Sequence, residues 1–171
     1  RFQKAMEGSV QAIALAVEMR DPYTSGHQNR VADLACTIAR EMELSEDRIY
    51  GLQMASVIHD LGKLTIPGEI LCKPGRLSAP EYAMIKTHVQ SGYDILKKID
   101  FPWPLADIVL QHHERLDGSG YPRGLSGDQI LLEARILVRF GDTAAGIRAY
   151  RRLLDRDGVG PRATAELHDL Y

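Results

Sequence analysis

Apolar residues recur at intervals of three and four along most of this chain, and that helical spacing limits the folds open to it. The apolar-to-polar alternation of a half-buried strand is not convincing anywhere. One clear helical face consists of Val31, Leu34, Ala35, Ile38 and Met42. The pattern predicts a single all-α domain over residues 1–171, with Arg1 already inside a helix.

Helix start and stop signals support this interpretation. Ser45 is a plausible N-cap, because Glu46 and Asp47 follow it where negative charge suits the helix dipole. That helix is expected to run into the pair His59-Asp60, after which Gly62 permits a break.

Two later helices have start signals of their own. Ser78 and Glu81 have capping-box spacing and predict a helix that continues through Val89. Pro104 can begin another helix, which leads to His112-His113. Two segments rich in glycine and proline, residues 66–77 and 117–127, are predicted to be ordered loops.

Charge and composition exclude several classes of function. A net charge of −2 gives no global field that would attract a nucleic-acid polymer, so an anionic substrate must be held by local positive charge. No apolar run approaches the ~20 residues of a membrane span, and no signal peptide is present. Cys36 and Cys72 match no metal or redox spacing, which favours two buried free thiols in a cytoplasmic protein. The start at Arg1 indicates a piece of a longer protein.

Five of the six histidines stand in settings that suggest a metal site: His27, His59, His88, His112 and His113. His168 lies in a polar stretch and is expected to play no part. Adjacent pairs such as His59-Asp60 are informative, because neighbours on a helix point in different directions. Both can serve one site only where metals lie between helices or where the helix is ending. Helix bundles build metal sites from ligands on several helices.

The types of ligand limit which metals the site can bind. Imidazoles and carboxylates without a thiolate suit iron, manganese, nickel, cobalt or zinc. Two metals sharing Asp60 could hold a hydroxide between them. Such a pair lowers the pKa of water and clamps the attacking and leaving oxygens of a phosphoryl centre.

Two motifs carry a family resemblance. The run His59-Asp60-Leu61-Gly62-Lys63 resembles the HD phosphohydrolase signature, and residues 112–122, read as HHERLDGSGYP, resemble the second signature of the HD-GYP family. The resemblance begins near Glu18 and is close to about Leu137. Two motifs of this length, found in this order, are specific to that family.

The resemblance implies an all-α HD-domain helical bundle with an inter-helix metal site. It implies hydrolysis of cyclic di-GMP to the linear dinucleotide, and in some members to GMP. Tyr23 stands where members with three metals have glutamate, so two divalent metals are expected, iron or manganese first and nickel, cobalt or zinc as alternatives. Carried over by position, the metal ligands are His27, His59, Asp60, His88, His112, His113 and Asp142.

The resemblance also assigns substrate contacts. Asp60 and Lys63 are the expected catalytic residues, with Lys63 on a substrate phosphate. The full expected substrate-binding set is Lys63, Arg115, Gly118, Gly120, Tyr121 and Pro122. Glu114 and Asp117 either orient the histidines or are structural. The Gly-Tyr-Pro loop is also an expected surface for a protein partner.

The chain departs from the family pattern near Asp142, which comes one residue later than the family spacing. One extra residue rotates the rest of a helix by about 100°, unless Gly141 absorbs it in a bulge. Asp142 remains the predicted seventh ligand, because no other carboxylate lies between Glu133 and Asp155.

Three functions stay open on the sequence. The first is an active cyclic di-GMP phosphodiesterase in bacterial signalling, with an N-terminal sensor or receiver domain as in a response regulator, and possibly a homodimer. The second is a catalytically impaired HD-GYP module that binds a ligand or a protein. The third is an HD phosphohydrolase of another nucleotide.

Overall fold

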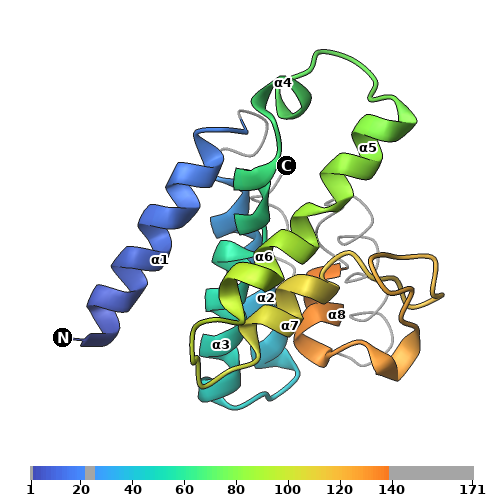
Figure 1. Cartoon of the computed structure of the whole chain (residues 1–171). Helices are drawn as coiled ribbons and strands as arrows, with labels where there is room; N and C mark the ends of the chain where they lie inside the picture. The colour runs from blue at the N-terminus through green and yellow to red at the C-terminus, as the bar shows by residue number, and fades with distance from the viewer. Residues whose placement is uncertain (1, 22–25, 139–171) are drawn as a thin grey trace, which may run out of the picture.

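The structure, a computed structural model, describes residues 2–21 and 26–138. Within these ranges there is no β-strand, and a single isolated bridge pairs Asp117 with Ser126. The elements, labelled in Figure 1, are α1 (Phe2–Glu18), α2 (His27–Glu41), α3 (Glu46–Ile58), the 3-10 helix η2 (Leu61–Thr65), α4 (Gly68–Leu71), α5 (Ala79–Lys86), α6 (His88–Leu96), α7 (Leu105–Gln111), the 3-10 helix η3 (Gly127–Gln129) and α8 (Leu132–Val138). The predicted all-α fold is confirmed.

The helices pack around one core. α2 lies against α3, α6 lies against both η2 and α7, and α1 covers one side of α3 (Figure 1). Leu52 of α3 and Ile108 of α7 are fully buried where these helices meet. Complete burial of such a side chain stabilises the fold by about 1.5–3 kcal/mol. The core therefore fixes the relative positions of the helices that carry the histidines.

Three predicted helix starts are confirmed. The Ser45 side chain accepts a hydrogen bond from the backbone N–H of Arg48 at the start of α3. Ser78 and Glu81 form both hydrogen bonds of a capping box at the start of α5. Pro104 immediately precedes α7. Local side-chain chemistry thus determines where these helices begin.

Other details differ from the sequence prediction. The helix expected to continue through Val89 ends at Lys86, and α6 begins at His88. The loop at residues 66–77 contains the short helix α4. Met42 is 47% exposed because it caps α2 and leaves the apolar face. Cys36 is buried as expected, but Cys72 is exposed because it caps α4 at the surface.

Gly62 allows η2 to pack directly on α6. A Cβ atom at this position would overlap the backbone carbonyl oxygen of His88 and crowd the backbone nitrogen of Gly92. The glycine predicted only to permit a break therefore has a second role, since it brings the Asp60 segment against the start of α6. None of the helices in residues 2–21 and 26–138 has the length and hydropathy that a membrane crossing requires.

Candidate metal centre

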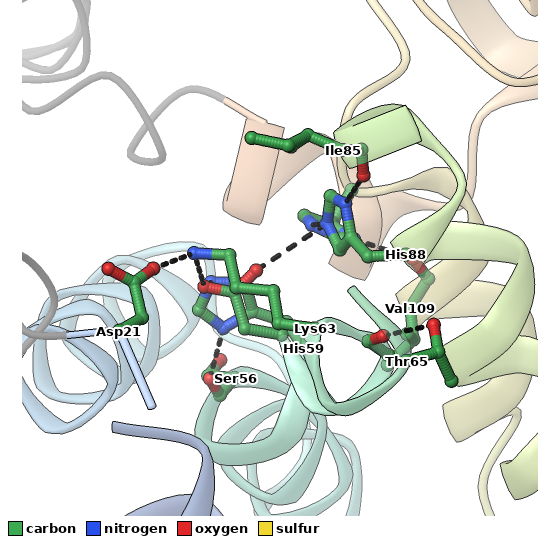
Figure 2. Close-up of polar contacts among 11 residues, drawn as sticks. Asp21, Ser56, His59, Lys63, Thr65, Ile85, His88 and Val109 are labelled. Carbon is green, nitrogen blue, oxygen red and sulfur yellow. Dashed lines mark hydrogen bonds and ion pairs between the residues drawn. The ribbon is translucent and has the colours of Figure 1, made fainter. Parts of the chain in front are cut away.

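Three of the predicted histidine ligands stand where one helix ends or the next begins. His59 caps α3, His112 caps α7, and His88 follows the end of α5. Each ring turns back and donates its Nδ1 hydrogen to the carbonyl three residues earlier: Ser56 for His59, Ile85 for His88 and Val109 for His112. The bonds of His59 and His88, 2.6 and 2.7 Å long, are visible in Figure 2. These bonds fix the tautomer and leave Nε2 as the free ligand atom.

The free nitrogens converge in the interior. The Nε2 atoms of His88 and His112 are 3.3 Å apart. Ligand atoms of His88, His112 and His113 all lie within 4.8 Å of one another, and so do those of His59, Asp60 and His112. Imidazole and carboxylate donors at this spacing fit a divalent transition metal. Both groups contain His112. One continuous cluster therefore joins the His59-Asp60 segment to the segment that begins with His112-His113.

Asp60 lies between the histidines with its two oxygens facing different rings. Its Oδ2 is 3.5 Å from Nε2 of His59, and its Oδ1 is 3.5 Å from Nε2 of His88. Burial alone would raise the pKa of the Asp60 carboxyl, but electrostatic interactions with His59, Lys63 and the neighbouring imidazoles hold this pKa well below its usual range. The group is therefore an anion, with one oxygen available on each side.

The imidazoles are electrically suited to bind a cation. Burial lowers the pKa of His88 and lowers that of His112 further, and neighbouring imidazoles add to the effect. Burial and the adjacent His88 lower the pKa of His113 to about 3. Neutral imidazole is the form that binds metal, so these side chains need to release no proton at neutral pH.

His27, the first residue of α2, is set apart from the tight groups. Its ring centroid is 5.9 Å from that of His59 in an edge-to-face arrangement. Desolvation and the nearby His59 lower its pKa. His27 thus borders the cluster on the His59 side. Tyr23 and Asp142 lie outside the described residues, and the assignment of Asp142 as a ligand stays a prediction.

Lys63 lies between two carboxylates. Its Nζ atom is 2.9 Å from Oδ2 of Asp21 and 2.9 Å from Oδ2 of Asp60, and its side chain is 15% exposed. The bond to Asp21 is drawn in Figure 2. Burial would lower the pKa of Lys63, but Asp60 and Asp21 raise it, so the ammonium stays charged. Sequence reasoning missed Asp21, whose only signal was its place in the stretch between Glu18 and His27, inside the region that resembles the family.

The loop after α7 is held from inside by Glu114. This carboxylate is fully buried and accepts the backbone N–H groups of Arg123 at 2.7 Å and Leu125 at 2.9 Å. Gly120 packs so closely on Glu114 that a Cβ atom would overlap its backbone. Gly118 lies in a turn with φ of 77°. Gly118 and Gly120, two of the predicted substrate contacts, are therefore glycine for structural reasons. Glu114 anchors the loop.

The remaining predicted substrate contacts differ in exposure. The Tyr121 ring stacks on the His113 imidazole, with centroids 4.8 Å apart and planes 20° from parallel. Pro122 is exposed. The Arg115 side chain is 66% exposed, and its Nε lies 3.8 Å from Asp117. Of these residues, Tyr121 makes direct contact with the cluster.

A hollow of about 580 Å³ lies elsewhere, bordered by α1, the last turn of α2, α3 and the segment before α7. It contains none of the predicted site residues. Its lining residues are Met6, Arg40, Glu46, Asp47, Ile49, Tyr50, Gln53 and Trp103.

Comparison with known proteins agrees with the motifs. Residues 11–155 match the family model described as an HD domain.

The chain belongs to the HD domain family.

Several curated proteins are similar in sequence to this chain. The chain is 43% identical over 128 residues to the cyclic di-GMP phosphodiesterase response regulator RpfG of Xanthomonas campestris, an alignment that covers 74% of this chain and 34% of the relative. It is 39% identical over 155 residues to the 3'3'-cGAMP-specific phosphodiesterase 3 of Vibrio cholerae, and this alignment covers 89% of this chain and 34% of the relative. A cyclic di-GMP phosphodiesterase of Thermotoga maritima is 43% identical over 123 residues, and this alignment covers 71% of this chain and 33% of the relative. The chain spans about a third of the length of these relatives.

Proposed function

We propose that this HD domain is a metal-dependent phosphodiesterase that hydrolyses a cyclic dinucleotide, cyclic di-GMP in the first place. The observation that carries the proposal is the convergence of His59, Asp60, His88, His112 and His113 on one cluster, in which all but the half-buried His113 are buried. The Nε2 atoms of His59, His88 and His112 are free as ligand atoms there. The names of the relatives, which act on cyclic di-GMP or 3'3'-cGAMP, support this substrate class.

The residues proposed to hold two transition ions, iron or manganese first, are His27, His59, Asp60, His88, His112 and His113, with Asp142 as the seventh. When bound, such ions supply Lewis acidity to the phosphodiester and make water more acidic. Asp60 supplies one oxygen toward His59 and one toward His88, which suits a ligand shared between two ions. The backbone carbonyls bonded to Nδ1 keep the imidazoles in the ligating tautomer.

The chain's own cations would orient the substrate. An ammonium group has three hydrogen-bond donors. Two of those of Lys63 face Asp21 and Asp60, which leaves one for a phosphate oxygen. Tyr121 and the loop anchored by Glu114 border the cluster on the His113 side. Arg115 and Pro122 on the same loop are solvent-facing and are proposed to contact the substrate or a protein partner.

We also propose a cytoplasmic setting in which this domain follows a sensor or receiver domain in a longer regulatory protein. A homodimer is a further possibility to measure. The printed description of the Xanthomonas relative as a response regulator supports the regulatory setting.

One experiment tests the proposal and separates it from its alternatives. The protein is purified without oxygen, its metal is quantified, and products from cyclic di-GMP, 3'3'-cGAMP and a panel of other nucleotides are separated by chromatography. Hydrolysis of a cyclic dinucleotide with about two ions per chain is the expected result. Binding without turnover would instead favour an impaired binding module, and turnover of only another nucleotide would favour a general HD phosphohydrolase.

A further inference from the structure

Tyr82, Lys86 and Tyr121 form a small aromatic and cationic corner beside the metal-ligand cluster. The Lys86 Nζ atom lies 5.0 Å from the ring centroid of Tyr82 and 5.3 Å from that of Tyr121. The Tyr121 ring also stacks on His113. A single aromatic ring thus joins a lysine at the end of α5 to a residue of the cluster.

The Lys86 ammonium has no carboxylate partner among the described residues. Lys63 is paired with Asp21 and Asp60, and Lys73 is paired with Glu81. Lys86 takes part in none of the ion pairs found in residues 2–21 and 26–138. Ring faces attract an ammonium group but do not neutralise it. The two tyrosines therefore hold the cation in place while its hydrogen-bond donors remain available to an anion.

A cyclic dinucleotide presents a second anion that such a cation can bind. It carries two phosphodiesters in one ring, and hydrolysis acts on one of them while the other remains charged. Lys63 is buried deep between carboxylates, so it belongs with the phosphodiester at the metal ligands. Arg115 is mostly in solvent near Asp117. Lys86 lies over the Tyr121 ring, and this ring stacks on His113. The Lys86 ammonium is therefore in a suitable place for the second phosphate.

We propose that Lys86 binds the second, non-scissile phosphate of the cyclic dinucleotide, with its ammonium held by the rings of Tyr82 and Tyr121. The inference rests on the proposed function and adds a substrate-binding residue to it. Tyr82 is 49% exposed, so a ligand can reach the corner from solvent. Lys86 is half-buried, which limits the freedom that it loses when a ligand binds.

The test compares Lys86→Met and Lys86→Arg with a matched control, Lys97→Met. Lys97 also lies over a tyrosine ring, 5.1 Å from the centroid of Tyr93, but it is paired with Asp94 at the surface. Equilibrium binding of cyclic di-GMP is measured on chelator-treated protein, where turnover does not interfere. Lys86→Met should weaken binding about tenfold or more, Lys86→Arg should retain most of it, and Lys97→Met should match wild type.

A second readout uses metal-loaded protein and two substrates. Bis(p-nitrophenyl) phosphate has one phosphodiester, so its hydrolysis should be unchanged in Lys86→Met while KM for cyclic di-GMP rises. An unchanged KM and unchanged binding, or an equal loss on both substrates, would overturn the inference. Wild-type protein that neither binds nor cleaves the dinucleotide would instead overturn the proposed function, and this inference with it.

Discussion

The Nζ atom of Lys63 lies 2.9 Å from a carboxylate oxygen of Asp21, 42 positions earlier in the chain. The neighbouring Arg20 donates hydrogen bonds to the backbone carbonyls of Leu64 and Ile66. The segment before α2 is thereby tied to Lys63 of the HD motif through Asp21 and to the residues just after the motif through Arg20. Asp21 is in a position to decide where the Lys63 ammonium stands relative to Asp60.

We predict that Asp21→Asn lowers turnover about tenfold while metal content stays at the wild-type level. The reason is that Lys63 would then keep only Asp60 of the two carboxylates that contact it among the described residues, and a small misplacement near a reacting group costs much rate. Asp94→Asn is the matched control, because it breaks an ion pair with Lys97 that is about half-exposed. Metal analysis and steady-state kinetics on both variants check this. Loss of metal in Asp21→Asn would show that Asp21 supports the ligands instead.

Replacing Asp60 should have a different effect. Asp60→Asn keeps the shape of the side chain but removes the anion that faces both His59 and His88. We expect the loss of at least one ion per chain and of most activity. Metal content after dialysis, measured beside the exposed-site control Asp117→Asn, is the test. Full metal content in Asp60→Asn would refute a shared carboxylate ligand.

The metal-free protein should lose stability as pH falls below about 6.5, the usual histidine pKa. His88, His112 and His113 have lowered pKa values in the folded state, His113 to about 3. The unfolded chain therefore binds protons that the folded chain does not, and the free energy of unfolding decreases by ~1.4 kcal/mol per pH unit for each histidine. Urea unfolding of chelator-treated protein between pH 7 and 5 measures the slope. The variant His113→Gln should reduce that slope, and a stability that does not change with pH would contradict the assignment.

The contact between η2 and α6 should not tolerate a methyl group. Gly62→Ala would push the Cβ atom into the His88 carbonyl, so we expect a loss of about 1–3 kcal/mol in the free energy of unfolding, together with reduced metal content. Gly68→Ala is the control, because nothing lies within 4 Å of the position its Cβ would take. Denaturant unfolding and metal analysis compare the two. Equal behaviour of both variants would mean that η2 can shift without cost.

The loop anchor offers another test. Glu114→Gln replaces a carboxylate that accepts two backbone N–H groups with an amide that can accept through one atom only. Faster hydrogen exchange at Arg123 and Leu125 is the expected result, with a higher KM for the dinucleotide and unchanged metal content. Exchange rates equal to those of wild type would indicate that other contacts hold the loop.

Much of the architecture was predictable because its causes are local. The 3.6-residue spacing of apolar positions gives the helices, and Ser45, Ser78 and Pro104 start them through bonds to residues nearby in sequence. The predicted ligands His59, Asp60, His112 and His113 were likewise visible as two distinctive pairs of adjacent residues. These features need no knowledge of how the helices pack.

The packing of the helices decided the rest. The sequence by itself determined an all-α chain that offers imidazoles and carboxylates at helix ends. Only the tertiary structure could bring Asp21 to Lys63 and Tyr121 against His113, aim the two oxygens of Asp60 at different rings, and place Lys86 over two tyrosines. Such contacts join residues far apart in the chain, and their geometry depends on how close η2 and α6 can approach, which the missing side chain of Gly62 sets.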